Sequence, residues 1–344
     1  MNIKRPTIKQ VAQAAGVSTQ TVSRVINDRP DVAPETRDRI HQAIQELGYQ
    51  PSALARSLIQ QRSFTLGIVT AGLKYIGPSR VLNGITSRAE QSGYTLLLKE
   101  LSEFNTLDSE PIILDLLSRH VDGIVWAVPE VGDNHRWVDQ SPDGFPVPIV
   151  FIATENRPEL FIVNYDNFLG GRMATEHLIK QGYQHIGHIT GPLDWWESRQ
   201  RKAGWQSALL EAGLQASEEC SAEGNWSSAS GESAFNQLLS RYPDMDAVFV
   251  GNDQMALSVL QVACRTGISV PQRLGVVGFD GLAESSYYWP PLTTVIQDQL
   301  LLGSTVVEEL VHWIEKARTS GEPPRPRTIV LKPELAVRES SVRK

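Results

Sequence analysis

Residues 7–27 read TIKQVAQAAGVSTQTVSRVIN, and this stretch decides the fold of the N-terminal part of the chain. Apolar residues recur at helical spacing from Thr7 to Ala15 and again from Thr19 to Asn27. Gly16 interrupts the pattern, and Ser18 stands directly before the second segment, where its side chain can cap a helix. The stretch therefore predicts two short helices joined by a tight turn.

A third helix is predicted from Pro34 to Leu47. Proline suits the first turn of a helix, and Gly48 suits the position just after its end. Ile40, Ile44 and Leu47 are spaced to form one apolar stripe. Residues 1–50 are thus expected to form a small three-helix unit with one core.

The second of these helices carries polar side chains at its N-terminal end, on an apolar back formed by Val22, Val25 and Ile26. A helix that enters the major groove of DNA needs this arrangement. Gln can pair with adenine and Arg with guanine. From the pattern alone, a three-helix bundle with an ordinary polar surface remains an alternative. The predicted base contacts are Thr19, Gln20 and Arg24, and the predicted phosphate contacts are Thr7, Ser18, Ser23, Asn27 and Thr36.

The charge of the chain is unevenly distributed. The whole chain of 344 residues has a net charge of −7, which alone would argue against nucleic acid. Residues 1–62, however, hold nine Lys/Arg and five Asp/Glu, a net charge of +4, and the remainder carries −11. A small basic module on an acidic body is suited to bind a phosphate backbone.

From Phe64 onward, apolar strands alternate with amphipathic helices, which is typical of doubly wound parallel sheets. About 275 residues of such units exceed one ordinary sheet, so two similar lobes with a cleft between them are expected. The fold class is therefore α/β, with an all-α headpiece and a two-lobed core. The predicted strands are 66–69, 95–98, 123–127, 149–152, 186–189, 247–250 and 274–278.

Several classes of protein are disfavoured by the sequence. No stretch approaches the ~18 consecutive apolar residues of a membrane span, and the opening residues lack the apolar run of a secretory signal, so a cytoplasmic protein is expected. Cys220 and Cys264 have no metal-ligand spacing, and no metal or cofactor is expected. Three of the seven histidines, His177, His185 and His188, lie close together in sequence but accompany no nucleophile or phosphate-binding glycine loop, so an enzyme is not expected.

Residues 7–27, followed by VAPETRDRIHQAIQELGYQPSALARSL at 32–58, resemble the headpiece of the lac repressor (LacI/GalR) family almost without gaps. The resemblance implies that Ser52–Leu58 is a hinge that becomes helical on operator DNA. It also implies that Ala55 and Leu58 contact bases in the minor groove, where Leu58 would act as an apolar wedge. The alternative is that Leu58 packs on the core.

The resemblance continues through the rest of the chain, in Gly191-Pro-Leu, Arg199–Trp205, Asn225-Trp226-Ser-Ser, Gly251–Leu257, Val276–Gly281 and Pro290–Thr294. It implies a core like the periplasmic sugar-binding fold, with an effector between the lobes. Arginine, asparagine and aspartate can meet sugar hydroxyls, and a Trp ring can stack on the sugar. The effector contacts implied by the family's motifs are Ala71, Arg201, Trp226, Asn252, Asp280 and Gln297.

The chain also departs from the family's pattern. It places Ala71, Ala127 and Ala153 where the repressor that gives the family its name has polar cleft residues, so a β-galactoside effector is in doubt. That repressor's C-terminal tetramer-forming helix has no counterpart after Val337. Aromatic residues that either widen specificity near the mouth of the cleft or belong to the core or surface are Trp126, Trp195 and Trp196.

The resemblance gives an expected domain organisation. Segment 322–327 is expected to cross between the lobes, and the polar tail 339–344 to be frayed. The expected domains are the headpiece at 1–50, a hinge or linker at 51–62, an N-terminal lobe at 63–165 and 296–325, and a C-terminal lobe at 166–295 and 326–338.

The function implied is that of a dimeric repressor whose affinity for a pseudo-palindromic operator in double-stranded DNA is controlled by a small-molecule effector, most simply a sugar or glycoside. A purine-type corepressor is the alternative effector. A solute-binding protein shares the two-lobed body, but it would need a signal peptide and no headpiece, and neither condition is met.

Overall fold

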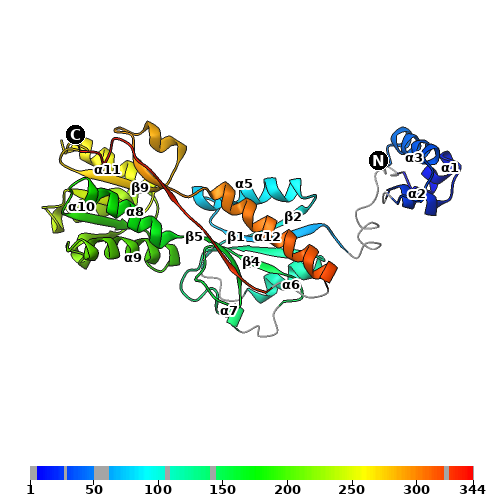
Figure 1. Cartoon of the computed structure of the whole chain (residues 1–344), viewed down its shortest axis with the longest axis horizontal. Coiled ribbons are helices and arrows are strands. Elements are labelled where there is room, and N and C mark those ends of the chain that lie inside the picture. Colours follow the sequence, from blue (N-terminus) through cyan, green and yellow to red (C-terminus); the bar gives the residue numbers. More distant parts are fainter. Residues whose placement is uncertain are drawn as a thin grey trace. The chain divides into compact units, whose positions relative to one another are not determined.

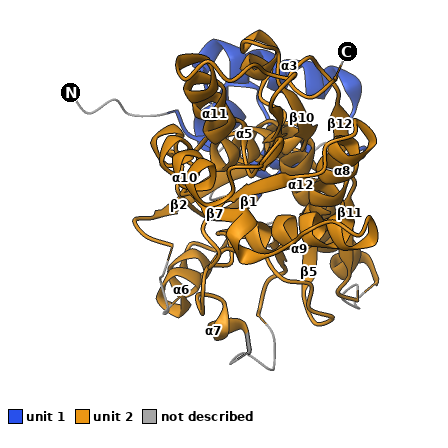
Figure 2. Cartoon of the chain, turned by 90° about the vertical axis from the view of Figure 1, so that its left-hand side faces the viewer, with its two compact units in different colours: residues 1–64 blue, residues 65–344 orange. Residues whose placement is uncertain are grey.

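The computed structural model describes residues 6–26, 29–49, 62–104, 109–139, 145–320 and 325–343. The chain divides into two compact units, Met1–Phe64 and Thr65–Lys344, coloured separately in Figure 2. In the described ranges, the first unit contains helices and the second contains two sheets with their helices, so the predicted fold class is confirmed. No helix in these ranges combines the length and apolar character needed to cross a bilayer.

The described residues of the first unit form three short helices around one core, as predicted; Figure 1 labels them α1 to α3. The backbone N–H of Thr7 donates to Gln10 Oε1 (2.8 Å), and Ser18 Oγ accepts from the Thr21 N–H (3.1 Å). Gly48 ends the third helix with a φ of 62°, a conformation that favours glycine. The helices are α1 (Ile8–Ala14), α2 (Thr19–Ile26) and α3 (Pro34–Leu47), within one residue of the predicted bounds.

The second unit contains a first six-stranded sheet in the order β11-β5-β4-β3-β1-β2, with every neighbouring pair parallel. Helices α5 and α12 pack closely because Gly84 and Gly303 each face backbone atoms of the other helix and leave no room for a Cβ. The strands are β1 (Thr65–Ala71), β2 (Thr95–Leu101), β3 (Gly123–Ala127), β4 (Ile149–Phe151), β5 (Phe161–Tyr165) and β11 (Thr328–Leu331); the helices are α5 (Ile76–Gln91), α6 (Glu110–Ser118), α7 (Arg136–Asp139) and α12 (Gln299–Ser320).

The second sheet of this unit has the order β12-β10-β9-β8-β6-β7, and only β12 among its described strands is antiparallel to its neighbour. Gly171 and Gly204 bring helices α8 and α9 into backbone contact. The strands are β6 (Ile186–Thr190), β7 (Ser221–Glu223), β8 (Ala247–Val250), β9 (Gly275–Asp280), β10 (Thr293–Ile296) and β12 (Glu334–Ala336); the helices are α8 (Asn167–Lys180), α9 (Trp196–Glu211), α10 (Ser228–Arg241) and α11 (Asp253–Arg265), with 3-10 turns at Glu218–Cys220 and Ala283–Tyr287.

The C-terminal segment corrects two expectations. Strand β11 pairs with β5, so residues 326–331 belong to the N-terminal lobe, and the chain crosses between the sheets after Leu331 rather than within 322–327. The predicted frayed tail was also wrong, since Ser340 and Ser341 are fully buried. Ser340 Oγ donates to the Val276 carbonyl (2.6 Å) and accepts from the Thr293 N–H (2.8 Å), so the tail packs on the second sheet.

Candidate ligand cleft and nucleic-acid interface

Helix α2 presents the three predicted base-reading residues to solvent. Thr19, Gln20 and Arg24 are exposed, while Val22 and Val25 on the opposite face are buried. Arg24 Nη1 lies 3.3 Å from Asp31 Oδ2, and both side chains are about half exposed. Because an exposed ion pair of this kind is worth only about 0–1 kcal/mol, the guanidinium can leave it for a base edge at little cost.

The predicted phosphate contacts lie at the starts of the helices and along their faces. Thr7 and Ser18 are exposed next to the first turns of α1 and α2, where backbone N–H groups also favour anions. Ser23 and Thr36 are partly exposed. The remaining DNA-contact predictions, Asn27, Ala55 and Leu58, lie outside the described residues.

A cavity lies between the two sheets, where their strands end. It spans about 940 Å³ including the open solvent at its mouth. Thr70 and Ala127 come from the carboxyl ends of β1 and β3, and Asp280 from that of β9; ligands of parallel α/β sheets usually bind at this edge. One wall is largely apolar (Ile68, Ile76, Val81, Leu82, Ile85, Leu302), and the other is polar (Glu197, Arg201, Asn252, Gln254, Asp280).

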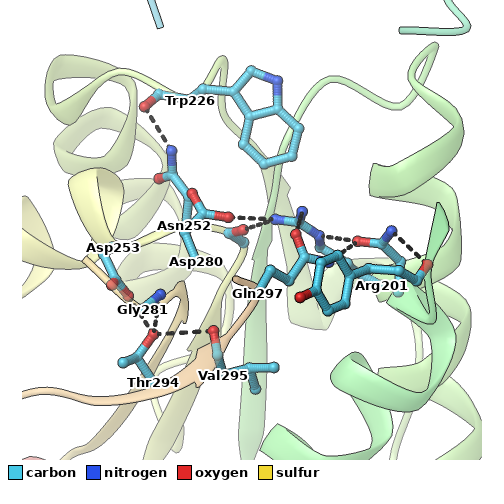
Figure 3. Close-up of polar contacts among 12 residues, drawn as sticks. Arg201, Trp226, Asn252, Asp253, Asp280, Gly281, Thr294, Val295 and Gln297 are labelled. Atoms are coloured by element: carbon cyan, nitrogen blue, oxygen red, sulfur yellow. Dashed lines mark hydrogen bonds and ion pairs between the residues drawn. The ribbon is translucent and has the colours of Figure 1, made fainter. Parts of the chain in front are cut away.

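Arg201 is the centre of the polar wall (Figure 3). Its Nε donates to Asn167 Oδ1 (2.8 Å), its Nη1 donates to the Gly251 carbonyl (2.6 Å), and its Nη2 reaches Gln297 Oε1 (3.4 Å). Nη1 also lies 3.6 Å from Asp280 Oδ1, in an ion pair whose side chains are 8% and 18% exposed. The guanidinium is therefore fixed in position from several sides before any ligand binds.

The close contact of α8 and α9 explains where Arg201 stands. Gly171 faces the Arg201 backbone directly, so a side chain at Gly171 would push α9 away. Asn167, in the first turn of α8, then lies within hydrogen-bond reach of both Arg201 and Gln297, whose Nε2 donates to Asn167 Oδ1 (3.1 Å). Arg201 also stacks on Phe279, with its Cζ 3.8 Å from the ring centroid.

Asn252 and Trp226 are held to each other at the far end of this wall. Asn252 Nδ2 donates to the Trp226 carbonyl (3.0 Å), and Asn252 Oδ1 caps α11 by accepting from the Met255 N–H (2.9 Å). Trp226 has a φ of 71° and Asp280 a φ of 102°, both in the left-handed region. Such strain costs about 1–3 kcal/mol per residue and is concentrated at functional sites.

Burial sets the charge state of the carboxyls around Asp280. It raises the pKa of Asp280 to about 6, against the opposing effect of Arg201, so the carboxylate is ionised at neutral pH. Burial also raises the pKa of Asp253 to about 7. Asp253 accepts hydrogen bonds from Thr294 Oγ1 (2.6 Å) and the Leu282 N–H (2.7 Å), which fixes the loop beyond Asp280.

Comparison with known proteins gives the family. Residues 7–52 match the model described as bacterial regulatory proteins, lacI family, and residues 175–341 match the periplasmic binding protein-like domain. The lactose operon repressor of Escherichia coli (strain K12) is 32% identical over 95% of this chain and 90% of its own length. The chain belongs to the LacI family. It is a DNA-binding transcriptional repressor with a ligand-binding core.

Two solved structures are similar to this LacI-family repressor over nearly its whole length. The lac repressor dimer bound to operator and the anti-inducer ONPF superposes with a TM-score of 0.87 at 31% identity, covering 99% of this chain and all of that one. The complex of the transcriptional regulator CelR with cellobiose superposes with a TM-score of 0.71 at 33% identity, covering 98% and 100%. Both proteins are regulators of transcription, which agrees with the prediction that the chain is not an enzyme.

The structure brings most of the predicted effector contacts of this LacI-family repressor together. Ala127 and Ala153 also line the cavity, but Ala71 does not, which corrects the prediction. Side chains alternate along a strand, so Thr70 points to the cavity while Ala71 packs in the core of the first sheet. The predicted contacts that line the cavity are Arg201, Trp226, Asn252, Asp280 and Gln297.

The three tryptophans that the sequence left undecided between the cleft and the core or surface have different positions. Trp126 is 1% exposed and belongs to the core beside α7. Trp196 is also buried and does not line the cavity. Trp195 is partly exposed and lines the cavity at its mouth. Only Trp195 of the three therefore adds aromatic surface to the cleft.

Sequence reasoning missed several cleft residues of this LacI-family repressor. Glu197 is the clearest, because its Oε2 atom is buried and has no hydrogen-bond partner among the described residues. The Oε1 atom of Gln299 is in the same state. Glu197 stands in the first turn of α9, where an acid is expected for the helix dipole alone, so only the folded arrangement distinguishes it. The other missed cleft residues are Thr70 and Gln254. Asn167, which was also missed, does not line the cavity but accepts hydrogen bonds from Arg201 and Gln297.

Replacing Glu197 with glutamine is expected to stabilise the protein at high pH. Burial raises the pKa of Glu197 to about 7 from an ordinary 4.5, so the folded state resists ionisation of this group. The stabilisation of the folded state by protonated Glu197 is complete below pH 4.5 and is lost as the pH rises through 7. Glu197→Gln should raise the free energy of unfolding at pH 8 by about 1–3 kcal/mol, and the gain should shrink toward pH 4.5. Urea titrations at pH 8 and pH 5 measure this; equal differences at both values would show that the pKa is ordinary.

Proposed function

We propose that the chain is a cytoplasmic repressor whose operator affinity is controlled by a carbohydrate bound in the cleft between the lobes. The observation that carries the proposal is the pairing of an apolar wall with a polar wall centred on Arg201 and Asp280. The arginine offers donors and the ionised aspartate offers acceptors, as sugar hydroxyls require. The apolar wall and the Trp226 ring suit the C–H faces of a pyranose.

The stereochemistry of the sugar is expected to differ from that of a β-galactoside. Ala127 and Ala153 line the cavity opposite the polar wall and make no hydrogen bonds through their side chains. On the same side, Thr70 and Gln299 offer polar atoms, and Glu197 adds a carboxyl group on the polar wall. A different set of hydroxyls is therefore recognised. The similar CelR protein was solved with cellobiose, which supports a carbohydrate.

We propose that the protein acts as a homodimer on a pseudo-palindromic operator, since a two-fold protein matches a two-fold site. Ligand binding between the lobes favours one lobe arrangement and thereby shifts the population of DNA-competent dimers. The sugar then acts as an inducer that weakens operator binding.

A thermal-shift screen of monosaccharides, disaccharides and nucleobases tests the class of effector. A ligand at 100 times its Kd stabilises the folded state by about 2.7 kcal/mol, which is readily seen as a raised Tm. A sugar is expected to raise the Tm and nucleobases are not. Stabilisation by a nucleobase alone would favour the purine-type corepressor instead.

Operator binding is expected to depend steeply on salt. A dimer that neutralises 6–10 phosphates loses about 10³- to 10⁵-fold in affinity between 50 and 200 mM salt. Fluorescence anisotropy of a labelled duplex selected from random DNA measures this loss. A flat response between the two salt concentrations would contradict DNA binding through the basic headpiece.

A further inference from the structure

A second hollow adjoins the cleft. This hollow, which we call the outer pocket, spans about 1100 Å³ including the open solvent at its mouth, and it shares Tyr75 and Trp195 with the cleft. The two hollows therefore meet at these two side chains. The outer pocket is lined by Gly72, Lys74, Tyr75, Glu100, Leu101, Ser102, Glu103, Phe104, Val131, Asp194 and Trp195.

Aromatic rings run from the cleft into the outer pocket. The Trp195 ring lies 5.8 Å from the Trp226 ring of the cleft and 4.7 Å from the Phe104 ring of the outer pocket, both edge-on. Tyr75 lies 6.1 Å from Phe104 and 6.5 Å from Trp195. All these rings except Trp226 are partly exposed, so they offer apolar surface that the described residues leave uncovered.

Polar side chains surround these rings. Lys74, Ser102 and Asp194 are exposed around the outer pocket. Glu100 is also exposed, and its Oε1 is held in place by the Leu73 N–H (3.1 Å). Carboxylates, a hydroxyl and an ammonium group around partly exposed rings are the groups that bind a second sugar ring, with the hydroxyls at its edge and the C–H groups on its face.

The two walls of the outer pocket come from different lobes, and backbone hydrogen bonds join them. The Gly132 N–H donates to the Asp194 carbonyl (3.3 Å), and the Trp196 N–H donates to the Glu130 carbonyl (3.2 Å). Val131 and Trp195 thereby form an isolated antiparallel bridge. A ligand in the outer pocket would contact both lobes, as a ligand in the cleft does.

We propose that the outer pocket is a second saccharide subsite, so that the effector is a disaccharide or longer. One ring occupies the cleft beside Arg201, and the next lies against Phe104 and Trp195. This inference rests on the proposed function, that the cleft takes a sugar. It extends that function by assigning the length of the ligand.

Matched pairs of sugars test the second subsite in the full-length protein. Isothermal titration calorimetry with glucose and cellobiose, glucose and maltose, and galactose and lactose is expected to give one pair whose disaccharide binds at least ten-fold more tightly than its monosaccharide. If no sugar binds while a nucleobase does, the proposed carbohydrate effector is wrong, and the second saccharide subsite is wrong as well. If a monosaccharide binds as tightly as every disaccharide built from it, only the subsite is overturned.

Single substitutions locate the second ring. Phe104→Ala removes a ring that lines only the outer pocket, and it should weaken the disaccharide about 3- to 10-fold while leaving the monosaccharide within two-fold. Trp195→Ala removes a shared wall and should weaken both. Asp194→Ala changes an exposed side chain, so it tests the subsite without disturbing packing, and it should also weaken only the disaccharide. Wild-type disaccharide affinity in both Phe104→Ala and Asp194→Ala would overturn the proposal.

Discussion

Replacing Arg201 with alanine is expected to weaken effector binding by roughly 30- to 5,000-fold. The substitution removes every contact that Arg201 makes to Asn167, Gly251, Gln297 and Asp280, and it leaves the Asp280 carboxylate buried without its partner. Truncating one member of a buried charge pair costs about 2–5 kcal/mol, or roughly 30- to 5,000-fold in affinity. Calorimetric titration with the sugar that gives the largest thermal shift measures the loss.

Lys202→Ala is the matched control for Arg201→Ala. Lys202 is the next residue on α9, but its ammonium group pairs with Glu218 (2.7 Å), and it does not line the cleft. The Lys202→Ala variant should bind the sugar like the wild type.

The double variant Arg201→Ala with Asp280→Asn should recover stability relative to Arg201→Ala, because the Asp280 charge is no longer left without its partner, but it should not recover binding. Wild-type affinity in Arg201→Ala would remove this residue from the site.

The double substitution Gln20→Ala with Arg24→Ala is expected to remove sequence-specific operator binding while leaving the headpiece folded. Both side chains are exposed on α2, and neither contributes to the core formed by Val11, Val22 and Val25. Each bidentate base contact is worth about 1–3 kcal/mol, so the loss in each half-site is expected to reach about 10²- to 10⁴-fold. Anisotropy titrations of a selected duplex and a scrambled duplex measure the change in specificity.

Arg39→Ala separates the loss of charge from the loss of base reading. Arg39 is an exposed cation on α3, so its removal changes the net charge of the headpiece as Arg24→Ala does. It should weaken the selected and scrambled duplexes by similar factors, as the loss of a phosphate contact does. If the Gln20/Arg24 variant behaved in the same way, those two residues would not read the sequence.

The headpiece was the most predictable part of the fold, because its signals are local. Ser18 caps α2 and Gly48 ends α3, and both were read from sequence. The predicted strands of the core were also found. Most are buried on both faces and are therefore continuous apolar runs, and the partly exposed edge strand β2 still contains the apolar run 96–98. The strands that were missed are short or interrupted: β5 contains the polar Asn164, β10 begins with two threonines, β11 has only four residues, none of them buried, and β7 and β12 have three residues each.

The cleft was predictable as far as family motifs extend. Arg201, Asn252 and Asp280 lie far apart in sequence and were placed together by resemblance, because no local pattern joins them. The prediction for Ala71 was wrong by one residue. Because side chains alternate along β1, Thr70 faces the cavity and Ala71 faces the core on the opposite side of the strand. Glu197 and Phe104 were missed because their positions depend on how the two lobes meet, which no local periodicity encodes.

The central claim is that sugar binding in the cleft lowers the affinity of the headpiece for the operator, and that operator binding lowers the affinity of the cleft for the sugar. The most direct test is an anisotropy titration of the selected duplex with the full chain, with and without saturating sugar, paired with calorimetry of the sugar with and without duplex. Thermodynamic linkage requires the two factors to be equal, and coupling of this kind is typically about 5- to 150-fold. The account predicts that the sugar weakens operator binding and that the operator weakens sugar binding by the same factor. Unchanged operator affinity under saturating sugar would contradict it.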